Sequence, residues 1–234
     1  MAFEHADHHR VQNGMRSILP GNVTVVSSRR YRDEPLMPGE EEVVARAVQK
    51  RRAEFTTGRA CARDALRQLG CEPAAISRGV RGEPVWPAGI VGSITHCAGY
   101  YAAAVARADC VAAVGIDAEP HEPLPDGVHS AVLTSTDKKN IRMLHDSDAG
   151  GNPQELIYGD RLVFSAKESV YKVWYPLMGT WLGFEEVTIS VETDGRFRAS
   201  LPRAVGAQGA YGDQVVGRWS IDNGIVLTAI VLAP

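Results

Sequence analysis

Cysteine is scarce in this sequence, and what there is does not form a metal-binding pattern. The four cysteines, Cys61, Cys71, Cys97 and Cys110, lack the short paired spacing of zinc or iron–sulfur sites. Cys97 adjoins His96, but neighbouring residues on a strand face opposite sides, so the two cannot work together as a thiol nucleophile in a regular strand. We expect four reduced cysteines in or near the core.

Long apolar runs and excess positive charge are also missing. No apolar run approaches the ~20 residues needed to cross a bilayer. The first residues, Met1–Arg10, are polar and histidine-rich, unlike a secretory signal. The net charge of −3 gives no general attraction to nucleic acid. We therefore expect a cytoplasmic protein without a membrane or nucleic-acid partner, built as one large or two small domains from its 234 residues.

Positive charge is nevertheless concentrated in one part of the chain. Two interpretations stay open for this cluster. It can be a solvated helix face with salt-bridge partners such as Glu54 and Asp64, or it can hold phosphate, because the arginine fork matches phosphate oxygens. The arginines of the cluster are Arg51, Arg52, Arg59, Arg63, Arg67, Arg78 and Arg81.

Two acidic motifs carry the strongest chemical signal. Gly115–Pro120 follows an apolar run that predicts a strand, so Asp117 and Glu119 lie on one face. Glu168 and Lys172 lie in a helical pattern, and their spacing of four places them on one face of that helix. Three carboxylates and a lysine together suit a hard cation with a phosphate. Mg²⁺ prefers such oxygen ligands and keeps positions for substrate phosphates.

The order of expected elements predicts an α+β fold. A Gly- and Pro-rich loop at 78–89 and a connection at 121–128 separate the elements. The long helix should stop before Pro176. The turns Asp194-Gly195 and Asn223-Gly224 predict hairpins. Strands are expected at 23–27, 90–96, 100–107, 111–116, 187–191, 197–201, 215–220 and 225–232, and helices at 40–50, 52–69, 137–144 and 160–174.

Several stretches together resemble the Sfp-type 4′-phosphopantetheinyl transferases, in particular the actinobacterial branch close to the EntD-like enzymes. This family is built as two similar α+β lobes related by a pseudo-twofold axis, with coenzyme A in the cleft between them. The resemblance implies lobes at residues 1–112 and 113–234 that act as one unit. The matching stretches, in the family's order, are Phe55–Arg63, Gly82–Pro87, Val91–Tyr100, Gly115–Pro120, Arg161–Lys172 and Trp174–Leu177.

The resemblance also implies a reaction. A serine of an apo acyl or peptidyl carrier protein attacks coenzyme A, takes its phosphopantetheine and releases 3′,5′-ADP, in the manner of a holo-acyl-carrier-protein synthase. Such relatives serve polyketide, nonribosomal peptide or siderophore biosynthesis. Mg²⁺, with Mn²⁺ as the alternative, would be held by Asp117, Glu119 and Glu168. A monomer is expected.

Roles for single residues follow from the same resemblance. Glu168 is the candidate base for the carrier serine, Lys172 would stabilise the leaving phosphate, and His96 would donate to the pyrophosphate. Lys167 is a further coenzyme contact or a surface charge, because it lies about 100° around the helix from Glu168. Arg52 can replace Arg51, and Arg81 can replace Arg78. The remaining coenzyme contacts are Ser93 and Thr95 beside the pyrophosphate, and Arg51, Arg59 and Arg78 at the 3′-phosphate and adenine end.

A surface for the carrier protein is implied as well. In the resembled family, the region between the lobes grips the carrier, whose recognition surface is acidic. Lys138, Lys139 and Arg142 would meet that surface beside apolar residues such as Ile141. Tyr171 and Tyr175 would extend it, whereas Trp174 is expected in the core, as helical spacing of aromatic residues indicates.

Other classes of function stay open. A Mg²⁺-dependent phosphohydrolase acting on a nucleotide or on the coenzyme A pyrophosphate also uses an Asp-x-Glu pair with a distant glutamate, although the stretches around Arg59 and Ser93 argue against it. A non-catalytic carrier-binding protein would not need Asp117, Glu168 and Lys172 intact. A serine hydrolase built on Ser93 lacks the Gly-x-Ser-x-Gly pattern.

Overall fold

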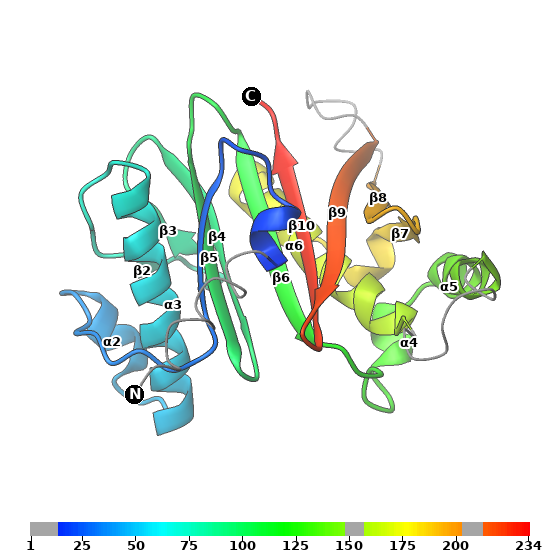
Figure 1. Ribbon diagram of the computed structural model, residues 1–234, viewed down its shortest axis with the longest axis horizontal. Helices are drawn as coiled ribbons and strands as arrows, with labels where there is room; N and C mark the ends of the chain where they lie inside the picture. Colours follow the sequence, from blue (N-terminus) through cyan, green and yellow to red (C-terminus); the bar gives the residue numbers. More distant parts are fainter. Residues whose placement is uncertain (1–13, 148–156, 203–212) are drawn as a thin grey trace, which may run out of the picture.

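Two antiparallel sheets, each with one long helix packed on it, make up most of the computed structural model, which describes residues 14–147, 157–202 and 213–234 (Figure 1). The first sheet has the order β1 (Thr24–Ser28), β5 (Tyr100–Arg107), β4 (Ile90–Cys97) and is covered by α3 (Gln49–Gln68). The second sheet packs against α6 (Gly159–Met178). Its order is β6 (Ala113–Pro120), β10 (Ile225–Leu232), β9 (Gln214–Asp222), β8 (Arg196–Ser200), β7 (Thr188–Val191).

Shorter elements surround these two layers. The predicted loop after α3 contains a two-stranded ribbon, β2 (Ser77–Arg78) with β3 (Pro84–Val85). At the far edge of the second sheet, α5 packs beside β7, on the right in Figure 1. None of the described helices combines the length and apolar composition needed to span a bilayer. The remaining short elements are α2 (Glu40–Val44), α4 (His129–Val132), α5 (Ser135–Ser147) and η2 (Phe184–Glu186).

The predicted hairpins are confirmed, and their turns have the expected backbone. Asn223 and Gly224 both have positive φ, 49° and 75°, which is the type I′ geometry that matches the twist of β9 and β10. The β4–β5 hairpin turns at Gly99, and β7 pairs with β8 across the predicted Asp194-Gly195 turn. The polar start, residues 1–10, and most of the predicted loop at 146–153 lie outside the described residues.

Three predicted boundaries are wrong. The helix expected at 40–50 is only the five-residue α2, and α3 already begins at Gln49. Helix α6 continues past Pro176 to Met178, because a proline removes only its own N–H bond and this one lies in the exposed last turn. The strand expected at 111–116 is β6, which extends to Pro120 and so includes both acidic residues of the first motif.

The two sheets meet along β4 and β6, and serine and threonine hydroxyls link them. Ser93 Oγ accepts the Ile116 N–H at 3.1 Å, and Thr95 Oγ1 accepts the Ala118 N–H at 3.1 Å. Both hydroxyl residues are buried. Side chains therefore take the place of a backbone ladder at this junction. The pseudo-twofold relation and the boundary at residue 112 stay predictions.

A close helix–strand contact sets the position of α6. A Cβ added at Gly115 on β6 would lie 2.2 Å from the Ser169 carbonyl oxygen on α6. Only glycine allows the two backbones to approach this closely. The glycine of the first acidic motif thus brings α6, and with it Glu168, against the strand that carries Asp117.

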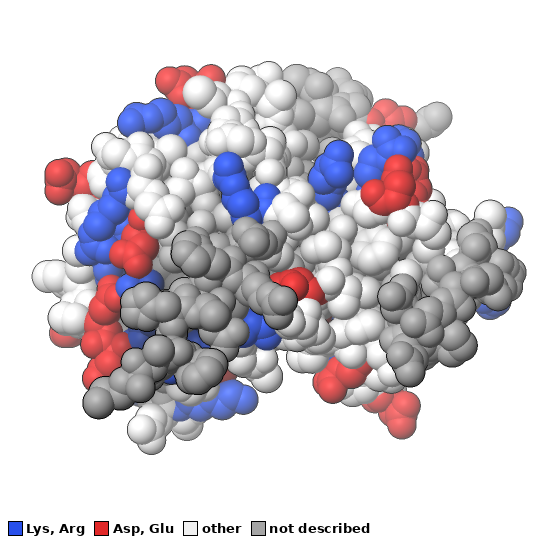
Figure 2. Space-filling view, in the orientation of Figure 1, with Lys and Arg blue, Asp and Glu red and all other residues white. Residues whose placement is uncertain are grey.

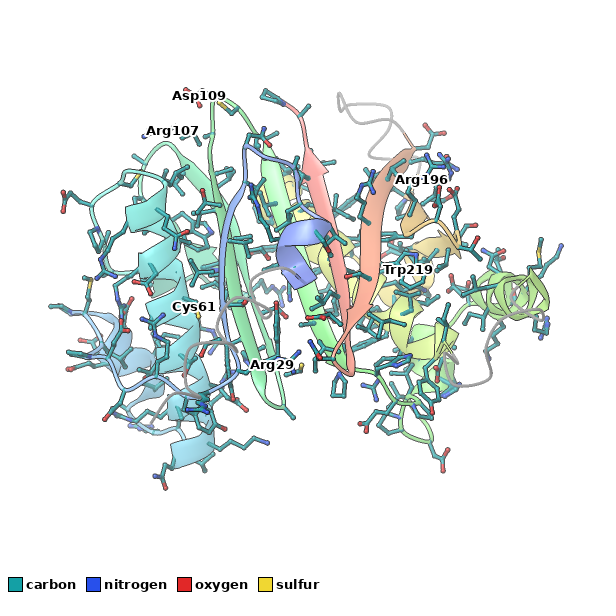
Figure 3. All side chains as sticks on the ribbon, viewed as in Figure 1. Arg29, Cys61, Arg107, Asp109, Arg196 and Trp219 are labelled. Carbon is teal, nitrogen blue, oxygen red and sulfur yellow. The ribbon has the colours of Figure 1, made fainter. Side chains whose placement is uncertain are left out.

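Arg29 adds a second link between the two sheets. It follows β1 and lies beside the β9–β10 turn in Figure 3. Its Nη2 donates to the Asp222 carbonyl at 3.4 Å and lies 3.9 Å from the Asp222 carboxylate.

The cysteines agree only in part with expectation. Cys61 lies inside the core between α3 and the first sheet, as predicted, whereas Cys110 is exposed, contrary to expectation. All four cysteines are unpaired.

A buried ion pair connects the segments that surround α3. Arg63 on α3 donates to both oxygens of Glu40, at 2.9 and 3.2 Å, and both side chains are almost fully buried. The Glu40 carboxylate also accepts the backbone N–H groups of Met37 and Ile76, at 2.9 and 2.8 Å. Glu40 therefore joins the chain before α2, helix α3 and the segment before β2.

Removing the Glu40 carboxylate should destabilise the fold strongly. Glu40→Ala leaves a buried guanidinium without its counter-ion, so we expect the free energy of unfolding to fall by about 3–5 kcal/mol in urea denaturation. Glu41→Ala, at the exposed neighbouring position, is the control and should change it by no more than about 0.5 kcal/mol. Equal losses for the two variants would contradict this role.

Candidate active site

Asp117 lies at the junction of the sheets, and its carboxylate is enclosed by donors. Only 4% of the residue is exposed. Its Oδ1 accepts the Thr95 hydroxyl at 3.1 Å and the Lys172 ammonium at 2.7 Å. Its Oδ2 accepts the Ser165 hydroxyl at 2.9 Å. The first sheet contributes Thr95 and helix α6 contributes the other two, so both halves of the fold hold this carboxylate.

Glu119, two residues further on β6, pairs with an arginine that the sequence interpretation did not assign. Arg161 Nη1 donates to Glu119 Oε2 at 2.8 Å. Arg161 is itself held by the carbonyl oxygens of Glu122 and Pro123, at 3.1 and 2.8 Å. Despite this pair, burial, followed by repulsion from Asp117, raises the pKa of Glu119 to about 7. Arg161 lies in a matching stretch of the family, which is the signal that could have identified it.

Glu168 lies on α6 one turn before Lys172, as the spacing predicts. Both side chains line a cavity of ≈ 390 Å³ between the β2–β3 ribbon, β4, the start of β6 and α6. Burial, with a smaller contribution from Asp117, raises the pKa of Glu168, and Lys172 opposes the shift. Tyr171 and Tyr175 line the same cavity and stack at 5.9 Å between ring centroids.

The donor set fits a hard divalent cation, although it is not gathered around one point. Within the described ranges, no group of three His, Cys, Asp or Glu side chains is close enough to hold a metal ion. All three candidate ligands offer carboxylate oxygens, as Mg²⁺ prefers. Burial is the main cause of the raised pKa of both Glu119 and Glu168, and Asp117 adds to both shifts, whereas Lys172 opposes them.

His96 on β4 and Arg51 on α3 are in direct contact. Arg51 Nη1 lies 2.7 Å from His96 Nε2. Because a guanidinium can only donate, His96 Nε2 must accept, and the ring proton is then on Nδ1. Burial lowers the pKa of His96, so the neutral ring is favoured at pH 7. The structure thus brings together two residues predicted for the coenzyme and selects Arg51 over Arg52 for this contact.

A cavity of ≈ 400 Å³ lies beside this pair, lined by α2, Arg51, Phe55 and Arg78. Arg59 lies behind it, stacked 4.0 Å from the Phe55 ring centroid, with Nε donating to the Ile76 carbonyl at 3.0 Å. Burial, with repulsion from Arg51, Arg63 and Arg78, lowers the pKa of Arg59 to about 10. Positive charge accumulates here, as an anion site requires.

Part of the arginine cluster is nevertheless structural. Arg63 binds Glu40, and Arg67 and Arg32 both pair with Asp64. Figure 2 shows positive and negative side chains intermixed along the flank that α2 and α3 form on the left of Figure 1. Arg51 likewise lies 3.6 Å from the Glu54 carboxylate, so the salt-bridge interpretation is confirmed for several of the arginines, and the phosphate interpretation stays a prediction.

Lys167 is not brought to the other site residues. Its ammonium donates to the Val132 and Phe184 carbonyls and to Asp137 Oδ2, at 2.8, 2.7 and 2.6 Å. The side chain is fully buried, and its three donors already have three acceptors. Lys167 therefore connects α6 with α5 and η2 instead of making the expected contact with the coenzyme.

The hydroxyls of Ser93 and Thr95 also have partners within the protein, and Ser93 lines the cavity that Glu168 and Lys172 line, so their place beside the pyrophosphate stays a prediction. The hydroxyls expected beside the pyrophosphate are 2% and 3% exposed as residues. They face β6, where they accept the N–H groups of Ile116 and Ala118. Trp174 is in the core, as predicted, with its indole N–H donated to the Thr180 carbonyl at 3.1 Å.

Comparisons with known proteins agree with this arrangement. Residues 39–106 match the 4′-phosphopantetheinyl transferase N-terminal domain, and residues 113–225 match the 4′-phosphopantetheinyl transferase superfamily. The chain is 44% identical to the 4′-phosphopantetheinyl transferase PptT of Mycobacterium tuberculosis, over 92% of this chain and 96% of that protein. It is 41% identical to Npt of Nocardia iowensis, over 94% and 100%. It is 48% identical to Svp of Streptomyces mobaraensis, over 86% and 81%.

The raised pKa of Glu119 predicts a pH-dependent stability. Between its ordinary value of 4.5 and about 7, the folded protein keeps the proton on Glu119 while the unfolded chain has lost it. Folding then takes up a proton, so its contribution to stability is full below pH 4.5 and is lost as the pH rises to about 7. Urea denaturation with chelator, compared with Glu119→Gln, should show the wild-type advantage decreasing over this window. An advantage that increases with pH would have the wrong sign.

Proposed function

The chain belongs to the 4′-phosphopantetheinyl transferase superfamily, and we propose that the side chains around Asp117 on β6 and Glu168 on α6 form its active site. As a phosphopantetheinyl transferase it modifies carrier proteins with coenzyme A as its substrate. The comparisons give no support to the phosphohydrolase alternative. The observation that carries the proposed site is the buried Asp117 carboxylate, near two glutamates whose pKa values are raised by burial first and by Asp117 in addition.

The family uses a divalent metal, and the proposed ion is Mg²⁺, held by Asp117, Glu119 and Glu168. Bound there, it would neutralise charge that develops on the coenzyme A pyrophosphate. Lys172 and Arg161 are the cations beside these carboxylates in the structure. They supply local positive charge that keeps three acidic groups compatible with folding.

Glu168 is the proposed base for the carrier serine. A hydroxyl proton is best taken by a group whose pKa lies near the working pH, and burial shifts Glu168 in that direction. Lys172, one turn later and 2.7 Å from Asp117 Oδ1, is placed to stabilise negative charge on the departing phosphate. His96, with its proton on Nδ1, is the proposed donor to the pyrophosphate.

The coenzyme's 3′-phosphate and adenine end is proposed to bind at the arginine-lined cavity of the first lobe. Arg51 and Arg78 line it, and Arg59 adds charge from behind. Arg51 also lies 3.6 Å from the Glu54 carboxylate, and half of its side chain is exposed. The repulsion that Arg51 and Arg78 exert on Arg59 supports the assignment. Arg63 and Arg67 are excluded because their guanidinium groups bind Glu40 and Asp64.

The carrier protein is proposed to dock beside α5. A second cavity of ≈ 390 Å³ there combines apolar side chains, among them Leu133 and Ile141, with the basic Lys138 and Arg142. Lys138 and Arg142 are exposed and suit an acidic partner surface.

Intact-mass measurement with coenzyme A, Mg²⁺ and a panel of apo-carrier domains tests the activity. The carrier should gain phosphopantetheine only without chelator, and hydrolysis of coenzyme A without transfer would refute this function.

Loss of the Asp117 carboxylate should abolish efficient transfer. Asp117→Ala removes a proposed metal ligand from a buried, preorganised position, so we expect turnover to fall at least ~10²-fold. Asp194→Ala, at an exposed turn remote from the site, is the control and should keep wild-type turnover. Turnover is measured as holo-carrier formed per unit time. A folded Asp117→Ala protein with near-normal turnover would contradict the assignment.

Arg51 and Arg52 provide a matched test of the coenzyme site. Arg51→Ala removes a guanidinium that lines the arginine cavity and contacts His96, so its Kd for coenzyme A should rise about tenfold, the cost of a charge-assisted hydrogen bond. Its affinity for 3′-dephospho-coenzyme A should change less, because that ligand lacks the phosphate. Arg52→Ala should bind both as the wild type does. Calorimetric titration decides, and equal weakening for both ligands would remove Arg51 from the 3′-phosphate.

A further inference from the structure

Ser165 on α6 lies directly behind the Asp117 carboxylate and belongs to a closed group of hydroxyls. Its Oγ is 2.9 Å from Asp117 Oδ2 and 2.9 Å from Thr228 Oγ1. Thr228 is the β10 residue paired in register with Asp117 on β6. Ser169, one turn further on α6, lies 2.6 Å from the same Thr228 hydroxyl. Ser165, Ser169 and Thr228 are all 0% exposed.

Counting the hydroxyl protons shows which atom donates in the hydrogen bond between Ser165 and Asp117. An ionised carboxylate only accepts, so the single Ser165 hydroxyl proton is donated to Asp117. The single Thr228 hydroxyl proton has two acceptors on Ser165, each at 2.9 Å: the Oγ and the carbonyl oxygen. Ser169 is left to donate to Thr228. The Ser165 proton is therefore the one directed at the carboxylate, while the Thr228 and Ser169 hydroxyls hold Ser165 from behind.

The same counting shows what this arrangement leaves on Asp117. A carboxylate has about four acceptor positions. Thr95 and Lys172 take two on Oδ1, and Ser165 takes one on Oδ2. The hydroxyl groups cannot leave, because Thr95 also holds the Ala118 N–H and Ser165 is enclosed by α6 and β10. Lys172, which is partly exposed, is the donor that can move.

We propose that Ser165, supported by the Thr228 hydroxyl, is a positioning residue for phosphopantetheinyl transfer: it fixes the orientation of the Asp117 carboxylate so that its open acceptor positions face the metal. This inference rests on the proposed metal site. Hydrogen-bonded partners behind a metal ligand typically change metal affinity by about 10- to 100-fold when they are removed. Ser165 touches neither substrate nor the proposed ion.

Ser169 supplies a matched control within the same helix. It is a serine with the same burial as Ser165 and the same Thr228 partner, but it makes no contact with Asp117. The alanine variants of both remove one buried hydroxyl from α6, so a purely structural role predicts similar losses for the two. A positioning role predicts a much larger loss for Ser165→Ala in metal binding than in stability.

The test titrates the full chain with Mn²⁺ alone, by calorimetry, and measures kcat and KM for coenzyme A beside it. For Ser165→Ala we expect Mn²⁺ affinity to fall about tenfold or more and kcat to fall with it, while KM for coenzyme A stays within about twofold. For Ser169→Ala the loss of Mn²⁺ affinity should stay below about threefold. Thermal midpoints of the two variants should be similar.

Two further variants keep the proposal falsifiable. Thr228→Val removes the hydroxyl at nearly constant volume and should weaken Mn²⁺ binding, whereas Thr228→Ser keeps the hydroxyl and should bind as the wild type does; this pair decides the question if Ser165→Ala does not fold. Asp117→Asn is the reference. If Asp117→Asn binds Mn²⁺ normally, the proposed metal site itself is wrong. If Asp117→Asn loses the ion but Ser165→Ala and Thr228→Val bind it as Ser169→Ala does, only the positioning role is overturned.

Discussion

A buried carboxylate at the seam between two sheets is the constraint on which the rest of the site depends. Asp117 would be costly to enclose without partners, because burial penalises charge unless hydrogen bonds replace water. Its partners come from both sheets and from α6: Thr95 on β4, and Ser165 and Lys172 on the helix. The same hydrogen bonds thus hold the two sheets together and stabilise the buried carboxylate of the proposed active site.

The hydroxyls at this seam do two things at once. Ser93 and Thr95 accept N–H groups of β6 that have no strand ladder on that side. Thr95 also donates to Asp117, so the position of β4 against β6 fixes where the carboxylate lies. Gly115 brings α6 close enough for Ser165 to reach the same group from behind. A shift of either sheet against the other would leave a buried charge without donors.

The charges of the two halves are arranged in a complementary way. Beside α2, burial lowers the pKa of Arg59, and repulsion from Arg51 and Arg78, which line the adjacent cavity, adds to the shift. Around Asp117, burial raises the pKa of both Glu119 and Glu168, and the Asp117 charge adds to both shifts. One side is prepared for a polyanion and the other for a cation. A ligand that carries phosphates with a divalent ion would relieve both, which is the reason the two halves are proposed to bind coenzyme A together.

The sequence by itself determined which residues pair locally, and the tertiary structure decided which of them face the site. Spacing was enough for Asp117 with Glu119 and for Glu168 with Lys172, because strand and helix periods depend only on the local backbone. The turn at Asn223-Gly224 was equally local. The partners of Lys167, Ser93 and Thr95 did not follow from spacing, because each polar group turns toward a buried partner that the packing offers: three acceptors around Lys167, and β6 for the two hydroxyls. Only the folded chain brings those partners, which are distant in sequence, within reach.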